Sequence, residues 1–282
     1  MIDGVRQFYL KNKNGQIYDM TRPERLFWLP EGFGWGIESV TERLGLTYFV
    51  VEENEVQPMP SGNMVFRTYD EFRRFLQFCY VGGLTLYYSP AYVVENKRWF
   101  ALDVSLIIDK SEIKPENDHL VCPVQFTGLS YWYELKTYQT ITGATDESGK
   151  KYPYTYPSTY GTGQSNIMHV NTELDSYFKL TIFGAVTNPQ WSIVKNGEVV
   201  HIGKVNTEIS ALQKFVVNTD PAKMEIAVYN RRNDKFLRNA YQESVFSTQR
   251  IFSIPKGETS FVVSSDDETQ IINAILEVYS RV

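Results

Sequence analysis

Short apolar runs, each ended within a few residues by Pro, Gly or Asn, recur along most of this chain. Such runs are typical of β-strands, because a helix needs a longer stretch with apolar residues every three or four positions. Asn14-Gly15 and Asn196-Gly197 each separate two runs, and Asn-Gly supplies the positive φ angles of a tight hairpin turn. Aromatic residues, which fit pleated and half-buried surfaces, make up 15% of the sequence, so we predict a mainly β fold. The expected strands lie at 8–10, 16–18, 46–51, 64–67, 84–88, 99–108, 120–126, 178–183, 190–195, 198–202, 213–218, 224–230, 250–254, 259–263 and 271–279.

One segment has helical spacing instead. Thr68 and Glu71 form a capping box, in which the hydroxyl and the carboxylate satisfy backbone N–H groups at a helix start. Gly82-Gly83 then supplies a stop signal. We therefore predict a single short amphipathic helix over residues 69–81, packed on a sheet through Phe72, Phe75, Leu76 and Cys79.

A change of composition between residues 136 and 165 indicates a domain boundary. The chain has 282 residues, enough for two ordinary domains. Pro153 and Pro157 favour extended backbone and oppose a central strand. We expect an N-terminal β domain over 1–140, a linker over 141–165 and a C-terminal domain over 166–282. The short strands and frequent turns of the last domain predict an antiparallel β-sandwich.

Charge and cysteine content exclude several classes of protein. The net charge is −5, and no basic stripe is present that would neutralise phosphates, so we expect no nucleic-acid binding. No apolar run is long enough for a membrane span, so we expect no membrane insertion. The N-terminal residues lack the apolar core of a signal peptide, which predicts folding in a cytoplasm. Cys79 and Cys122 are accordingly expected to be buried free thiols.

A search for catalytic and metal-binding patterns returns nothing specific. The three histidines stand alone, and neither H-E-x-x-H, C-x-x-C nor G-x-S-x-G occurs. We therefore expect no catalytic residue, no metal site, no cofactor and no enzymatic activity. Weaker candidates are better interpreted as structure: the pair His119 and Cys122, the Gly-rich loop 32–36, and the acidic cluster 266–268, which lacks the spacing of a calcium loop.

A series of segments has the same order along the chain as in a known family. It comprises residues 69–76 of the predicted helix, then 84–88, 100–110, 120–126, 131–133, 152–157, 182–184, 188–193 and the turn 196–197. Together these segments resemble the distal tail (Dit) family of long-tailed phages of Gram-positive bacteria. The resemblance rests on the series rather than on any one member.

The resemblance implies both a fold and a function. The N-terminal domain would form a homohexameric ring, and the C-terminal domain would be a galectin-like β-sandwich. The protein would be a structural component at the distal end of the virion tail, made in the bacterial host cytoplasm. A headless, tail-like bacteriocin is the variant of this interpretation. The implied partners are further copies of the chain, the phage tail tube protein, the tail-tip or tail fibre protein, and in some phages a receptor-binding protein.

A ring is also plausible on physical grounds. Strand-rich domains have edges that must be covered, and contacts between identical subunits cover them. Interface cores are enriched in aromatic residues, so we name Phe27, Trp28, Phe33 and Trp35 as candidate subunit contacts. The alternative is that these rings lie in the core of their own domain.

The alternative function is a carbohydrate-binding module that attaches to host cell surfaces. Its candidate sugar contacts are Tyr154 and Trp191. A lectin-like fold does not by itself confer sugar binding, because function resides in the site and not in the fold. The aromatic segment around Tyr154 is equally consistent with a stretch held against the protein surface. A secreted hydrolase is disfavoured by the absence of a catalytic pattern.

Overall fold

The structure is a computed structural model that describes residues 6–34, 36–90, 98–108, 114–116, 118–140, 166–245, 247–248, 251–267, 270 and 272–282. The chain divides into two compact units, Met1–Glu134 with Val282, and Leu135–Arg281. One α-helix and several antiparallel sheets form the regular structure of the described residues, which confirms the mainly β fold with one helix. The predicted linker 141–165 lies outside the described residues, so the domain limits at 140 and 166 stay predictions.

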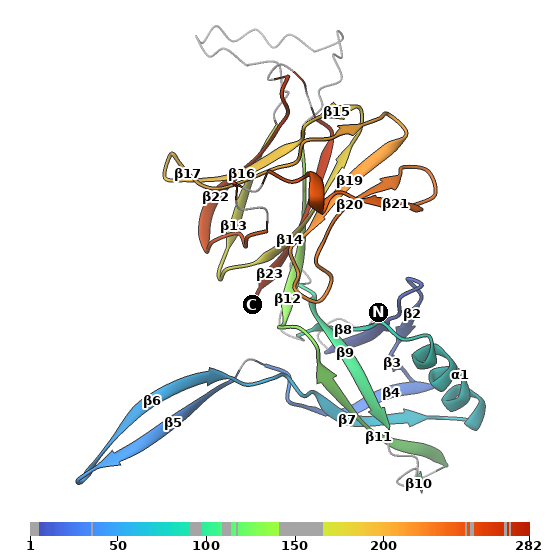
Figure 1. Ribbon diagram of the computed structural model, residues 1–282. Helices are drawn as coiled ribbons and strands as arrows, with labels where there is room; N and C mark the ends of the chain where they lie inside the picture. The colour runs from blue at the N-terminus through green and yellow to red at the C-terminus, as the bar shows by residue number, and fades with distance from the viewer. Residues whose placement is uncertain are drawn as a thin grey trace, which may run out of the picture. The chain divides into compact units, whose positions relative to one another are not determined.

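The N-terminal unit is built on an antiparallel sheet (Figure 1). β1 pairs with β2 and β8, β8 pairs with β9, and the order continues through β11, β7, β4 and β3. The predicted hairpin is present, with Tyr9 opposite Asp19 and Gly15 at φ 76° in the turn. The strands are β1 (Gln7–Lys11), β2 (Ile17–Asp19), β3 (Thr21–Arg22), β4 (Arg25–Glu31), β7 (Ser61–Phe66), β8 (Leu84–Ser89), β9 (Phe100–Ile108), β10 (Lys114–Glu116), β11 (His119–Gly128) and β12 (Tyr133–Gln139), the last of which crosses into the second unit.

The helix α1 (Tyr69–Tyr80) begins and ends close to the predicted positions. The Glu71 backbone N–H donates to Thr68 Oγ1 at 3.3 Å, which is one half of the predicted capping box. The other half does not form, because the Glu71 carboxylate binds the guanidinium groups of Arg74 and Arg25 at 2.5 and 3.6 Å. Gly82 at φ 78° follows the helix.

Aromatic rings fill the core of this unit. Phe75 of α1 lies 5.4 Å from Phe66 of β7 between ring centroids, and Phe27 of β4 contacts Phe8 of β1 edge-on at 5.2 Å. Edge-to-face pairs of this kind add to the free energy gained by burying the rings. The predicted inner face of α1 is confirmed, since Phe72 and Phe75 are buried while Leu76 and Cys79 pack against the same core.

The C-terminal unit is an antiparallel β-sandwich. One sheet has the order β13-β22-β16-β17, and the other includes β21-β20-β19-β14-β23. Phe178 meets Phe261 at 5.1 Å between ring centroids and Trp191 meets Phe215 at 5.9 Å, each pair joining the two sheets. The elements are β13 (Ile167–Thr172), β14 (Tyr177–Phe183), β15 (Val186–Thr187), β16 (Gln190–Lys195), β17 (Glu198–Lys204), β18 (Glu208–Ile209), β19 (Gln213–Asn218), β20 (Glu225–Asn230), β21 (Phe236–Asn239), the 3₁₀ turn η2 (Tyr241–Glu243), β22 (Gly257–Ser264) and β23 (Ala274–Arg281).

The strand predicted at 250–254 is wrong for the residues that the structure describes there. Ile254 makes only an isolated bridge to Ser176. Phe252 is buried, lies 5.6 Å from the Phe178 ring and stacks on His201. These residues are apolar because they fill the sandwich core, and not because they belong to a hydrogen-bonded ladder.

Among the described residues, no helix has the length and apolar character needed to cross a membrane.

The sandwich core predicts the effect of one small substitution. Gly203 of β17 lies opposite Trp191 of β16, and a Cβ atom at position 203 would overlap the Trp191 indole. We expect Gly203→Ala to lower the free energy of unfolding by about 1–3 kcal/mol through overpacking. Urea unfolding measures the change. The matched control is Gly34→Ala, whose Cβ meets nothing within 4 Å, and equal stabilities of the two variants would contradict the packing.

Candidate assembly surface

Two strands of the N-terminal unit form a sheet of their own. β5 (Ile37–Leu44) and β6 (Thr47–Glu55) pair from Ile37 opposite Glu55 to Leu44 opposite Thr47, and we call this ribbon the arm. Figure 1 shows the arm running away from β4 and β7 as a long two-stranded projection. At its base, the Val56 backbone N–H donates to the Gly36 carbonyl oxygen at 2.9 Å. Every residue of both strands is exposed, so neither face of the arm packs on a core.

The outer half of the arm is apolar. Leu46 is 93% exposed, Leu44 74% and Tyr48 66%, and the neighbouring Phe49 and Val50 are 44% and 51% exposed. A hairpin without a core is at best marginally stable in water. Monomeric soluble proteins rarely expose contiguous apolar surface of this kind, and such surface marks a contact site. The arm is therefore the first candidate assembly surface of the chain.

The base of the arm is acidic. Glu38 lies on β5, and Glu52, Glu53 and Glu55 lie on β6, close to the point where the arm meets the rest of the unit. Arg43 is the one basic residue between positions 37 and 55. The arm thus combines a negatively charged base with an apolar outer half.

The aromatic residues predicted as subunit contacts occupy different positions. Phe27 is buried and packs on Phe8 and Phe126, as the alternative interpretation held. Phe33 also packs against the core of its unit. Trp28, which follows Phe27 on β4, is 54% exposed, so the Trp28 ring is available to another chain. Trp35 lies outside the described residues.

Sequence analysis missed half of the arm. Residues 47–55 fall partly within a predicted strand, but 37–44 were not assigned to any element. The available signal was the pair Gly45-Leu46, because glycine at the first central position is typical of a two-residue hairpin turn.

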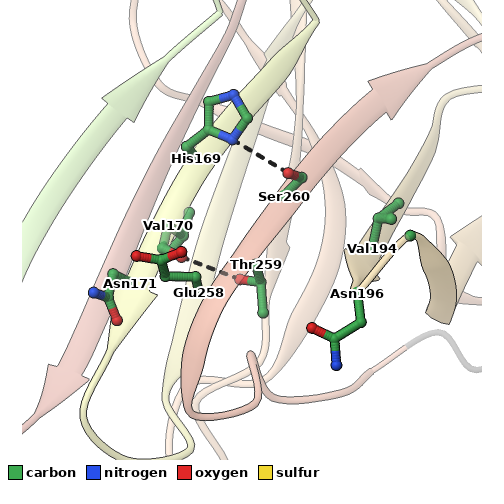
Figure 2. A pocket seen from close by; sticks show the side chains of 9 residues that line it. His169, Val170, Asn171, Val194, Asn196, Glu258, Thr259 and Ser260 are labelled. Atoms are coloured by element: carbon green, nitrogen blue, oxygen red, sulfur yellow. Dashed lines mark hydrogen bonds between the residues drawn. The ribbon is translucent and has the colours of Figure 1, made fainter.

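A polar groove lies on the C-terminal unit. Its volume is about 580 Å³, and Figure 2 shows side chains from β13, β22 and the end of β16 around it. His169 Nδ1 lies 3.2 Å from Ser260 Oγ, and the Thr259 hydroxyl donates to the Val170 carbonyl oxygen at 3.4 Å. Asn171, Asn196 and Glu258 supply further amide and carboxylate groups. The groove offers hydrogen bonds to a polar ligand, and no Phe, Tyr or Trp side chain lines it among the described residues.

The predicted sugar contacts do not lie in this groove. Trp191 is fully buried between the two sheets and packs on Gly203 and Phe215, so its ring cannot serve as a surface platform for a sugar. A tryptophan on a strand of alternating pattern carries no signal that separates a core position from a binding position. Tyr154 lies outside the described residues.

The weaker chemical candidates have structural explanations. His119 and Cys122 are three positions apart on β11, so their side chains point to opposite faces of the sheet. The Asp266 carboxylate accepts hydrogen bonds from the Lys204 ammonium at 2.7 Å and from the Asn188 amide, and these bonds lower the pKa of Asp266. Glu268 lies outside the described residues. Within the described part of the chain, no three His, Cys, Asp or Glu side chains gather as metal ligands would.

Comparisons with known proteins point to one family. Residues 7–129 match the family model described as distal tail protein, N-terminal domain. A chain from the phage p2 baseplate in its activated conformation has 16% sequence identity, covers 97% of both chains and gives a TM-score of 0.67. The Dit protein of phage SPP1 has 10% identity and a TM-score of 0.54, covering 96% of this chain and 98% of its own. At these identities the structural likeness establishes the fold alone. A search of curated protein sequences finds no match.

Both cysteines are free; Cys122 is buried as expected, whereas Cys79 is only partly buried, at the edge of the same core. Burial raises the pKa of the Cys79 thiol to about 12 and that of Cys122 to about 11. At pH 8 the reactive thiolate is then roughly one part in ten thousand and one in a thousand, against about a quarter for an unfolded cysteine. We expect an aromatic disulfide reagent to react with neither thiol quickly in the folded protein and with both in denaturant. Fast reaction of either thiol before unfolding would contradict this burial.

Proposed function

The chain belongs to the distal tail protein family, and on this premise we propose that it assembles into a homohexameric ring. Its place is the tail tip or baseplate of a phage virion, and its role there is structural rather than enzymatic. The proposed ring joins the phage tail tube protein on one side to the tail-tip or tail fibre protein on the other. A receptor-binding protein is a further proposed partner.

The observation that carries the ring proposal is the arm. Nine residues of β6 at about 3.3 Å each give a length of about 30 Å. A compact unit of 134 residues has a radius of gyration of about 14 Å, so the length of the arm is about twice that radius and the arm can reach far over a neighbouring unit of the same size. Its two free strand edges and its exposed apolar side chains are both groups that contact with another copy would satisfy.

Removing the arm should abolish self-assembly without unfolding the chain. Replacing residues 38–54 by an Asn-Gly turn retains Ile37, Glu55 and the hydrogen bond between Val56 and Gly36. The arm contributes no residue to the buried core, so the shortened chain should keep the thermal unfolding midpoint that the intact chain has when it is dissociated. Light scattering of the intact chain should give a mass several times 32.6 kDa, or a concentration-dependent approach to one, and the shortened chain should give 32.6 kDa.

The control is Val199→Asp, which changes an exposed apolar residue of β17 in the other unit. This variant should assemble as the unmodified chain does. An armless chain that still forms the full assembly would refute the proposal that the arm holds the ring together.

The polar groove favours a second candidate function, the binding of a neutral saccharide. Its volume of about 580 Å³ falls within the range of about 300–1,000 Å³ found for small-molecule sites. The imidazole of His169, the amides of Asn171 and Asn196 and the carboxylate of Glu258 are suited to hydroxyl groups.

A glycan array tests this second function. We expect dose-dependent binding to one class of sugar, weakened about three- to tenfold by His169→Ala, because one hydrogen bond to the ligand is lost. Val200→Ala is the control, since Val200 is an exposed residue of β17 that does not line the groove. An array without binding, or equal binding by both variants, would reject the groove as a sugar site.

A further inference from the structure

The arm ends in a small apolar knob. Gly45 and Leu46 form the two-residue turn between Leu44 and Thr47, with Gly45 at φ 63°. Leu46 is 93% exposed and Leu44 is 74% exposed, so the knob of these two leucines stands clear of the rest of the chain. The Arg43 Nε–H group donates to the Gly45 carbonyl oxygen at 2.8 Å, and this hydrogen bond stabilises the turn.

The same unit contains an aromatic hole. A pocket of about 210 Å³ opens to the surface between the rings of Phe33, Tyr88, Phe100 and Trp132. Its volume is below the range of about 300–1,000 Å³ that is typical of small-molecule sites, and it suits one or two side chains.

The knob of one chain cannot fill the hole of the same chain. Gly34 lines the hole, and the arm begins at Ile37 only three positions later. The hole therefore lies near the base of the arm, whereas the knob lies about 30 Å away at the other end of its paired strands. Both apolar surfaces stay uncovered in a single chain.

We propose that the leucine knob of one copy inserts into the aromatic hole of the next copy. The inference rests on the proposed function, because it specifies the contact that the self-assembling chain makes. The apolar knob matches the apolar lining of the hole, which Val282 completes beside the four rings. The two surfaces are different patches of one chain, so each copy uses its knob on one neighbour and its hole on the other. Contacts of this head-to-tail kind generate rings when the rotation closes.

Two variants disable the two halves of the contact separately. Leu44→Asp with Leu46→Asp places charges on the knob, at two positions that are largely exposed. Gly34→Phe adds a ring at a residue that lines the hole and should block it, and a Cβ at this position meets no atom within 4 Å, so the fold should tolerate the change. Each variant alone should stay monomeric, with the concentration for assembly raised at least about tenfold for each buried leucine that is lost.

A mixture of the two variants gives the sharpest result. The knob variant keeps its hole and the hole variant keeps its knob, so one working contact remains in an equal mixture. Light scattering should then show a one-to-one dimer of twice 32.6 kDa and nothing larger.

A disulfide provides a second measurement of the same contact. Leu46→Cys combined with Gly34→Cys should give chains linked end to end on oxidation, and reductant should release them. Leu46→Cys alone is the control and should give no chains longer than two copies. The native thiols are buried or partly buried, with raised pKa values, and should not interfere.

The outcomes separate this inference from the proposed function. If both variants assemble like the unmodified chain while the armless chain does not, the knob and hole are refuted and the ring proposal stands. Full assembly of the equal mixture would also refute the knob and hole. If the unmodified chain remains monomeric at every concentration, the proposed function is overturned and this inference with it.

Discussion

The exposed apolar surface of the arm is the constraint on which the functional interpretation depends. A two-stranded ribbon has no interior, so the side chains of Leu44, Leu46 and Tyr48 are buried against no core in the described part of the chain. Burial in a partner is the remaining way to remove this surface from water, and each leucine buried contributes about 1.5–3 kcal/mol. The arm is then ordered and stabilised in the same step that assembles the protein. Folding of this segment and assembly of the particle are in this sense one process.

The aromatic core of the N-terminal unit determines where the arm begins. Phe27 packs so closely on Gly62 of β7 that a Cβ at Gly62 would lie 2.7 Å from its ring, which fixes β4 against β7. Phe33 joins the same aromatic cluster at 5.2 Å from Phe8, just before the arm leaves the unit. These rings were candidates for a subunit contact, with burial in the core of their own domain as the alternative. They instead hold the root of the segment that we propose makes the contact.

The elements predicted correctly are those that residues close together in the sequence specify, through caps, turns and the spacing of apolar side chains. The helix followed from the Thr68 cap and from apolar residues at helical spacing, and both signals are local. Phe27 and Trp28 could also have been separated, because neighbours on a strand point to opposite faces, and the structure has one buried and the other exposed. Burial of Trp191 could not be predicted, since its partners Phe215 and Gly203 come from other strands. Strand β5 was missed because it packs on no core, and a core-facing alternation is the signal that identifies strands.

The charge of the arm decides which assembly its apolar surface favours. Two arms that paired with each other would bury the same leucines and would give a symmetric dimer. However, residues 37–55 carry five glutamates and one arginine, so two arms laid side by side would bring like charges together along their edges. Charged residues on exposed strands are a common protection against such edge-to-edge pairing. Repulsion between arms therefore directs the apolar outer half to a different surface of the neighbouring copy. A contact between two different surfaces propagates from copy to copy, which is the geometry that a closed ring requires.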